Sequence, residues 1–392
     1  MKRARIEELL AFHRDGLLKD TVPFWMKHAL DRRCGGYFNY IDRDGAVADT
    51  DKAIWIQGRF AWLLALLYNE VEPRREWLEA SLHGIRFLEK HAFDTDGRMF
   101  FRVTRDGRPL RKRRYVFSES FGAIAFAEYG RAAKDARRMQ TARRIYQTLV
   151  RYYENPDLLP PKVYPQTRAA KGLAMPMILI VTSQQMRRIG EDALYDDMIR
   201  FCIREVLEDH MHPREKAVLE NVGPKGERLD CVEGRCINPG HAIEAAWFIL
   251  EEARRTGDRR LTEKACLIMD WSLERGWDRK YGGLLYFVDV EGKPPEQYEH
   301  DMKLWWPHNE ALYATLLAHH MTGLKKYETW YERLHDWAYS HFPDPKYGEW
   351  FKCLHRDGSL ASTVKGNRWA GPFHLPRSQF LLWRLCEEML QT

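Results

Sequence analysis

Two histidines of this sequence, His241 and His374, each follow a Gly/Pro turn and open an apolar segment with helical spacing. Each also has a charged residue three positions further on, Glu244 in the first case and Arg377 in the second. Imidazole is the side chain whose ordinary pKa lies nearest neutrality, so it can take up and return a proton near pH 7. Two such histidines in matching settings predict a site that transfers protons with two bases.

Other polar residues stand near the starts of neighbouring helical segments. Arg59 lies among apolar residues, where a buried guanidinium needs either a structural carboxylate or an anionic ligand, and the sequence leaves both open. Glu310 follows Trp305 and Trp306, and indoles beside an acid are typical of sugar binding, although tryptophans that pack a helix start would look the same.

Further candidates serve as substrate contacts. Glu119 lies between two serines and is either a helix cap or a site carboxylate. Met175 opens a segment whose thioethers would form a pliable apolar wall, and Asn238 begins the turn before His241. The candidate substrate-binding residues are Trp306, Glu244, Glu119, Asn238, Met175 and Arg377.

A metal centre is not predicted. The His-x-x-Glu spacing from His241 to Glu244 is half of a possible metal site, but no second pair at suitable spacing accompanies it. Cys231 and Cys236 are separated by four residues, and no second cysteine pair at ligand spacing follows. The seven cysteines are odd in number and scattered, which indicates reduced thiols and a cytoplasmic location rather than a disulfide framework.

Composition limits the classes of partner. The chain has 392 residues, of which 45% are hydrophobic and 13% aromatic, enough for a large core. Its 62 basic and 56 acidic residues leave a net charge of +6, and no basic stripe with interleaved aromatics indicates a nucleic-acid partner. The first 18 residues predict an amphipathic helix rather than a signal peptide, and the longest apolar run, 60–68, is too short to span a bilayer.

A recurring sequence motif, called the arm phrase below, indicates the architecture. An aspartate, glycine with aromatic residues, and an Asp-Gly or Glu-Gly turn recur at 31–45, 94–107, 278–292 and 344–358, with a weaker copy at 211–228. Alternating aromatics closed by such a turn predict a β-hairpin arm at each copy. The spacing of the turn glycines corresponds to a period of about 60 residues, which gives about six units across the chain.

Segments with helical periodicity lie between these arms. Twelve helices paired into six units predict an all-α (α/α)6 barrel formed by a single catalytic domain, residues 1–392, with the hairpin arms at one rim. A less regular all-α array is the alternative. The predicted helices are 5–28, 53–68, 77–91, 119–133, 135–153, 175–189, 193–209, 241–256, 260–276, 308–322, 327–342 and 378–391.

The strings NPGHAIEA at 238–245, WWPHNEAL at 305–312 and GPFHLPR at 371–377 resemble those of the N-acylglucosamine 2-epimerases, also known as renin-binding proteins. LENV at 219–222 and WIQGRF at 55–60 fit the same family. The resemblance covers nearly the whole chain. It implies an (α/α)6 barrel, a homodimer, and interconversion of N-acylglucosamine and N-acylmannosamine without a redox cofactor.

By motif match, the resemblance implies that His241 and His374 are catalytic and that Arg59 and Glu310 support them. Several N-acyl members are described as nucleotide-activated, so ATP is a possible allosteric activator, although the chain has no Gly-rich Lys-Ser/Thr loop. Cellobiose and mannose epimerases, an aldose–ketose isomerase and a non-catalytic protein-binding scaffold are the alternatives. A hydrolase on the same barrel would require paired catalytic acids, whereas the best-placed pair here is two histidines.

Overall fold

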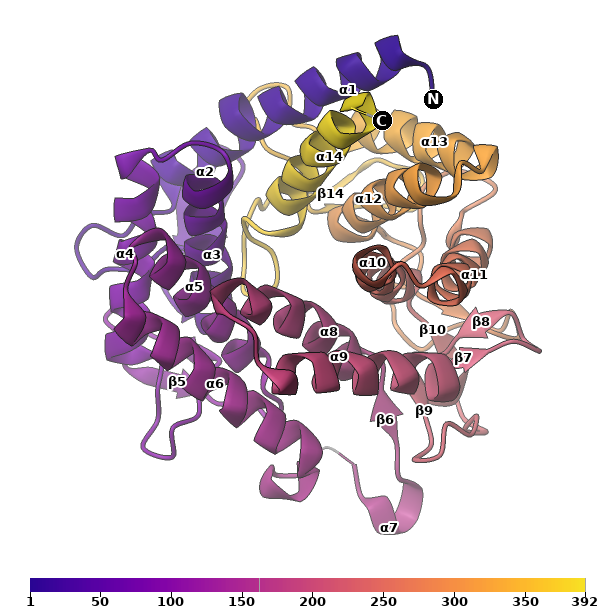
Figure 1. The fold of residues 1–392 in the computed structure, drawn as a ribbon, viewed down its shortest axis with the longest axis horizontal. Coiled ribbons are helices and arrows are strands. Elements are labelled where there is room, and N and C mark those ends of the chain that lie inside the picture. Colours follow the sequence, from indigo (N-terminus) through magenta and orange to yellow (C-terminus); the bar gives the residue numbers. More distant parts are fainter. Residues whose placement is uncertain (162, 392) are drawn as a thin grey trace.

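The computed structural model of the chain describes residues 1–161 and 163–391, and within these ranges the helices close into a ring (Figure 1). The inner helices are α3 (Ile54–Glu70), α5 (Phe117–Ala132), α8 (Ala174–Met186), α10 (Pro239–Thr256), α12 (Trp305–Thr322) and α14 (His374–Gln391). The outer helices are α4 (Arg75–His91), α6 (Ala136–Glu154), α9 (Ala193–Glu205), α11 (Arg259–Gly276), α13 (Lys325–His341) and α1 (Arg3–Asp15). Because α1 packs on α14, the first and last helices close the predicted (α/α)6 barrel.

The inner and outer helices differ in sequence because they differ in surroundings. Helix α3 is buried on almost every face between Ile54 and Leu67, since helices pack around it. Helix α4 is amphipathic, and its buried residues recur at helical spacing along one stripe that includes Trp77, Ile85 and Leu88. No helix in the described ranges is long and apolar enough to cross a membrane.

The connections on the two sides of the ring differ in length. Helix α10 ends at Gly257, whose φ of +69° is a left-handed conformation that favours glycine, and Asp258 then caps α11 by accepting a hydrogen bond from the Leu261 amide (3.0 Å). The return from α11 to α12 covers residues 277–304. Such long returns lead into the inner helices, so the N-terminal ends of these helices meet the arms at one rim.

Two predicted helices include a π-helical stretch. The segment 5–28 consists of α1, a π-helical stretch η1 (Gly16–Thr21) and α2 (Val22–His28). Pro23 has no amide hydrogen to donate to the preceding turn, which accounts for the widened turn there. A second π-helical stretch, η4 (Val206–His210), follows α9. The remaining short segments are η2 (Pro156–Leu158), α7 (Pro165–Arg168), η3 (Arg187–Ile189) and η5 (Glu233–Arg235).

Three of the four strong arm predictions are confirmed as antiparallel hairpins. They are β1 (Tyr40–Ile41) with β2 (Val47–Asp49), β4 (Arg102–Val103) with β5 (Pro109–Arg111), and β13 (Cys353–Leu354) with β14 (Leu360–Ser362). Their turns contain Gly45, Gly107 and Gly358, each with φ between +90° and +94°. The weaker copy contains the short hairpin of β7 (Met211–His212) and β8 (Ala217–Val218).

The prediction of a hairpin at 278–292 is wrong. The turn is present, with the Gly292 amide donating to the Asp289 carbonyl (3.0 Å), but none of the strands in the described ranges returns from it. Pro294 and Pro295 follow the turn and lack the amide hydrogens that a strand ladder requires. Strand β11 (Val288–Asp289) pairs instead with β10 (Cys236–Ile237), the segment directly before α10.

The same kind of strand pairing recurs around the ring. An arm strand pairs with the segment that leads into the preceding inner helix, so each arm fixes the start of its neighbour's inner helix. The pairs are β4 on β3 (Lys52–Ala53) before α3, β13 on β12 (Lys303–Leu304) before α12, and β9 (Asn221–Val222) on β6 (Lys171–Gly172) before α8.

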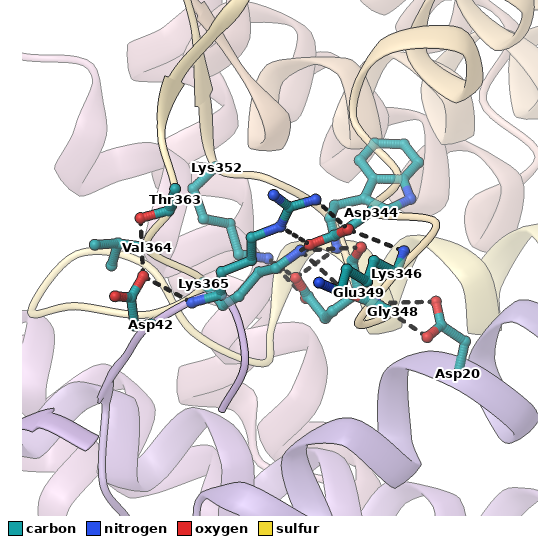
Figure 2. A network of polar contacts seen from close by, with 12 residues as sticks. Asp20, Asp42, Asp344, Lys346, Gly348, Glu349, Lys352, Thr363, Val364 and Lys365 are labelled. Atoms are coloured by element: carbon teal, nitrogen blue, oxygen red, sulfur yellow. Dashed lines mark hydrogen bonds and ion pairs between the residues drawn. The ribbon is translucent and has the colours of Figure 1, made fainter. Parts of the chain in front are cut away.

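A repeated group of charges, a buried aspartate and lysine with a more exposed arginine, links the arms. In each copy, the aspartate that opens one arm binds a lysine just before the inner helix of its own unit and an arginine in the turn of the next arm. The three triads are Asp31–Lys52–Arg105, Asp278–Lys303–Arg356 and Asp344–Lys365–Arg43. The third joins residues 301 positions apart and therefore closes the ring of arms. Figure 2 shows Asp344 and Lys365 of this triad in one polar network with Glu349 and Lys352.

Removing the Asp344 carboxylate tests whether the triad that closes the ring of arms stabilises the fold. Asp344→Ala leaves the ammonium group of Lys365, which is fully buried, without its acid, and breaking such a pair typically costs about 3–5 kcal/mol. Equilibrium unfolding in urea should therefore show a decrease of that size in the free energy of unfolding. Asp15→Ala is the matched control, since its pair with Lys19 is exposed and should contribute little to the free energy of unfolding. Equal effects of the two substitutions would contradict a structural role for the triad.

Candidate active site

The four residues predicted to be catalytic lie within the first six residues of four inner helices. Arg59 belongs to α3, His241 to α10, Glu310 to α12 and His374 to α14. The starts of these helices meet at the rim that carries the arms. The ring therefore gathers residues that are far apart in the sequence.

Glu310 is the most heavily used acceptor of this group. One carboxylate oxygen accepts hydrogen bonds from His374 Nδ1 (2.6 Å) and Arg377 (2.7 Å), and the other accepts from Trp247 Nε1 (2.8 Å). Arg377 also donates to Glu244 (2.6 Å). Because a carboxylate only accepts, Nδ1 of His374 carries a proton, and Nε2 of the neutral ring is then free to act as a base.

His241 has a carboxylate partner of its own. Its Nδ1 lies 3.0 and 3.1 Å from the two carboxylate oxygens of Glu220, which assigns a proton to Nδ1 by the same reasoning. The side chain of Asn238 accepts a hydrogen bond from the His241 amide (3.1 Å), and Pro239 occupies the first helical position. The helix cap thus fixes the backbone, and Glu220 orients the imidazole.

The two imidazoles contact the same indole. The ring centroid of Trp306 lies 5.2 Å from that of His241 and 5.6 Å from that of His374. The two histidines and Trp306 therefore line one small region at the centre of the ring. The structure brings together the pair on which the sequence interpretation depends.

The surroundings of the two histidines shift their pKa values in opposite directions. Burial lowers the pKa of His374 well below its ordinary value, and the positive charges of Arg377 and Arg59 add to this effect. Burial also acts on His241, but the charge and hydrogen bond of Glu220 outweigh it and raise the pKa of this ring. Near neutral pH, one imidazole is therefore held neutral while the other favours its proton.

Arg59 is a buried cation that forms no ion pair with any described residue. In the described ranges it has no ion pair or hydrogen bond with another side chain, and its Nε is buried and unpartnered. Its guanidinium carbon lies 4.3, 4.1 and 4.7 Å from the ring centroids of Trp55, Phe121 and Phe373. Burial lowers the pKa of Arg59 to about 9, although Glu244 and Glu310 oppose the shift. An anionic ligand would complete this site.

Two of the predicted substrate contacts lie outside this cluster. Glu119 is buried at the start of α5, where one oxygen accepts hydrogen bonds from Arg98 Nε (3.1 Å) and the Met99 amide (2.9 Å). Burial raises the pKa of Glu119. Met175 is partly buried and packs against the apolar core. Glu119 thus ties the second arm to α5, and the two residues are used for packing and arm attachment.

Sequence reasoning assigned no role to several residues that the structure places here. Glu220 lay in a string that resembles the family, but nothing in the sequence paired it with His241. Trp247 follows Glu244 by three residues and therefore shares its helix face, which was an available signal. The rings around Arg59 come from three separate segments, so no local pattern joins them.

Three potential metal ligands lie close together within the cluster. Ligand atoms of Glu244, Glu310 and His374 all lie within 4.8 Å of one another. The guanidinium of Arg377 donates to both carboxylates and supplies positive charge at the same place. The absence of a catalytic metal therefore stays a prediction.

A cavity of about 470 Å³ lies inside the ring, and its lining includes Arg377, Phe373 and Trp247 but neither histidine. Most of its lining comes from the middle and C-terminal turns of the inner helices, for example Glu251 and Leu385. The histidines lie in the first turns. This cavity is therefore distinct from the histidine site, although Arg377 borders both.

The fold and this site define a sugar epimerase of the isomerase class, built on an (α/α)6 barrel. The chain belongs to the N-acylglucosamine 2-epimerase family, whose model, N-acylglucosamine 2-epimerase (GlcNAc 2-epimerase), matches residues 36–374. It is 38% identical to the N-acylglucosamine 2-epimerase of Bos taurus and 35% identical to that of Mus musculus. The first alignment covers 96% of this chain and 90% of the relative, and the second 95% and 90%.

A solved structure resembles the whole ring. The cellobiose 2-epimerase from Spirochaeta thermophila DSM 6192 superimposes with a TM-score of 0.84, at 21% identity, over 99% of each chain. At this level of identity the likeness shows the fold. The barrel predicted from the sequence is thus confirmed both by the structure and by this relative.

Replacing the Glu220 carboxylate tests whether Glu220 raises the pKa of His241. Glu220→Gln removes the negative charge that raises the pKa of His241, so that pKa should fall toward and below its ordinary value as burial takes over. Titration of the imidazole Cε1 protons by NMR measures the change, with His241→Gln used to assign the signal. Glu215→Gln, beside His212, is the control and should leave His241 unchanged. An unshifted His241 in Glu220→Gln would contradict the assignment.

Proposed function

We propose that this protein interconverts N-acyl-D-glucosamine and N-acyl-D-mannosamine by removing and returning a proton at C2 of the ring-opened sugar. The observation that carries the proposal is the contact of His241 and His374 with one indole, Trp306, in surroundings that favour opposite protonation states. The N-acylglucosamine 2-epimerases to which the chain is similar support the choice of sugar.

In the proposed reaction, the aldehyde at C1 makes the C2 proton acidic. Nε2 of neutral His374 takes this proton, and the electron pair of the C–H bond moves into an enolate. Protonated His241 then gives a proton to the other face of C2, which inverts the centre. The resulting state, with His374 protonated and His241 neutral, is the one that performs the reverse reaction. No redox cofactor is needed, because no electrons leave the sugar.

The enolate oxygen develops negative charge at C1, and Arg59 is the proposed partner for it. A donor that is fixed before the reaction and lacks a competing carboxylate loses little in reorganisation, which is why such donors are effective. Glu310 holds the Nδ1–H of His374 and thereby leaves Nε2 free toward the substrate. Trp306 supplies a flat apolar face for the sugar carbons.

The cellular location, the oligomeric state and the effect of ATP are also proposals. We propose a cytoplasmic enzyme, which the seven free cysteines support, and a homodimer, which the family resemblance implies. ATP would act as an activator and not as a reactant, since proton transfer at C2 consumes no nucleotide. Addition of ATP to a steady-state assay tests the activation, and light scattering of the purified protein tests the homodimer.

An aldose–ketose isomerase is the nearest competing activity. It would use the same deprotonation at C2 but return the proton to C1, giving a ketose. Cellobiose and mannose epimerisation would use the same two histidines on another sugar. A protein-binding scaffold would turn over no sugar at all.

Solvent isotope incorporation separates these reactions. In deuterium oxide, N-acetylmannosamine should give N-acetylglucosamine that carries deuterium at C2, read by NMR, because the returning proton comes from solvent through an imidazole. Mannose and cellobiose, tested separately, define the sugar range. Unlabelled product would contradict deprotonation, and a ketose would favour the isomerase.

Single histidine variants assign the two bases. His241→Ala and His374→Ala should each abolish epimerisation, because inversion needs a proton donor on the face opposite to the base. Each variant should still exchange the C2 proton of one epimer with deuterium, and the two variants should exchange opposite epimers. His355→Ala, on an exposed arm turn, is the control. Retained epimerisation in either variant would contradict the two-base account.

The guanidinium of Arg59 is tested by Arg59→Ala. Loss of one preorganised oxyanion donor typically lowers kcat by about 10²–10³-fold. Steady-state kinetics should show this loss mainly in kcat, since the charge develops after binding. Arg333→Ala removes a guanidinium that also stacks on two tryptophans, but on the exposed face of an outer helix, and should keep normal kinetics. A purely KM effect of Arg59→Ala would contradict the assigned role.

A further inference from the structure

We propose that the mouth of the histidine site carries a second subsite, formed by Trp369, Arg113 and Arg368, that binds an anionic group, either phosphate or carboxylate. In treating this subsite as the outer part of a sugar site, the proposal rests on the proposed function. The anion binding itself depends only on the residues described below. The anion is either part of the sugar or part of a separate small molecule.

An aromatic wall leads from Arg59 outward. The ring of Trp55 lies against Arg59, with its centroid 4.3 Å from the guanidinium carbon. The centroid of Trp369 lies 5.6 Å from that of Trp55, and Phe101 contacts both indoles, at 5.7 and 5.6 Å. These rings form a chain of contacts from Arg59 to Trp369.

Trp369 is exposed yet held in place. Its side chain is 46% exposed, which is unusual for an indole. Asn367 Oδ1 accepts hydrogen bonds from the Trp369 amide (2.7 Å) and the Ala370 amide (2.9 Å). Trp55 Nε1 donates to the Arg368 carbonyl (2.7 Å), which fixes the neighbouring residue. The loop thus presents a flat face in a fixed orientation, and a flat face of this kind suits the apolar side of a ring-shaped ligand.

Arg113 stands over this wall without an acid. Its guanidinium carbon lies 4.4, 5.0 and 5.2 Å from the ring centroids of Phe101, Tyr115 and Trp369. Among the described residues no carboxylate pairs with it, and its Nε is buried without a hydrogen-bond partner. The turn arginines of the three arm triads differ, because each of those binds an aspartate.

Two further arginines add positive charge at the same place. Arg368 precedes Trp369, Arg111 ends β5, and neither has an acidic partner in the part of the chain that the structure describes. Burial lowers the pKa of Arg113, and the positive charges of Arg111 and Arg368 lower it further, as cations near this guanidinium do. An arrangement of like charges around an exposed ring is stabilised by an anion, and guanidinium groups bind phosphate and carboxylate through paired hydrogen bonds.

Calorimetric titration with pyrophosphate tests the subsite without any turnover. The wild-type protein should bind pyrophosphate saturably, and Arg113→Gln and Arg368→Gln should each weaken binding at least about tenfold. Arg108→Gln is the matched control, since Arg108 lies on the same arm, is exposed and pairs with Asp106. Circular dichroism verifies that each variant is folded. Absence of binding, or equal affinity in wild type and Arg113→Gln, would overturn the proposal.

Kinetics with two sugars then identify the source of the anion. If the substrate carries it, N-acetylmannosamine 6-phosphate should have a higher kcat/KM than N-acetylmannosamine, and Arg113→Gln should remove the difference. If a separate molecule carries it, pyrophosphate should change the KM for N-acetylmannosamine in the wild type but not in Arg113→Gln. Either result supports the subsite, and the absence of both overturns its link to the sugar site. Failure of the proposed function would appear differently, as no turnover of either sugar while calorimetry still reports the anion.

Discussion

The pKa values of the two histidines depend on how the buried charges at the centre of the ring are balanced. Glu310 accepts hydrogen bonds from His374, Arg377 and Trp247, and Arg377 is shared with Glu244. A carboxylate that is already neutralised by a guanidinium orients its histidine without raising the histidine's proton affinity. Among the residues that the structure describes, no lysine or arginine pairs with Glu220, and its charge and hydrogen bond raise the pKa of His241. The same residue pair, histidine with glutamate, thus has pKa values shifted in opposite directions: burial dominates at His374, where Arg377 and Arg59 add to it, and Glu220 dominates at His241.

The arms provide the rigidity that this balance requires. The histidines, Glu310 and Arg59 are on four different helices, so small shifts between helices would separate them. Each docked strand and each Asp–Lys–Arg triad joins the segment before one inner helix to the next arm. Buried pairs of this kind are costly to break, and they fix the relative positions of the helix starts. The fold therefore places buried ion pairs around the rim where the chemistry is proposed.

Helix periodicity and the repeated arm phrase were sufficient to predict the barrel, because both are local signals that recur. The hairpin at 278–292 failed because Pro294 and Pro295 lie just beyond the phrase and block the returning strand. In the site, His241 and His374 were predictable from their matching turns. Glu220 was not, since its pairing with His241 depends on how a loop folds back. The sequence also predicted substrate contacts for Glu119 and Met175; Glu119 binds the second arm and Met175 packs on the core, so a role of either in substrate binding stays a prediction.

The most direct measurement of the central claim is a crystal structure with N-acetylmannosamine, or a non-reacting open-chain analogue of it, bound in the ring. The account predicts that Nε2 of His241 and Nε2 of His374 lie on opposite faces of C2, each within about 3–3.5 Å of the carbon or its hydrogen. It also predicts the C1 oxygen beside Arg59. Both imidazoles on the same face of the sugar, or one beyond reach of C2, would contradict the account.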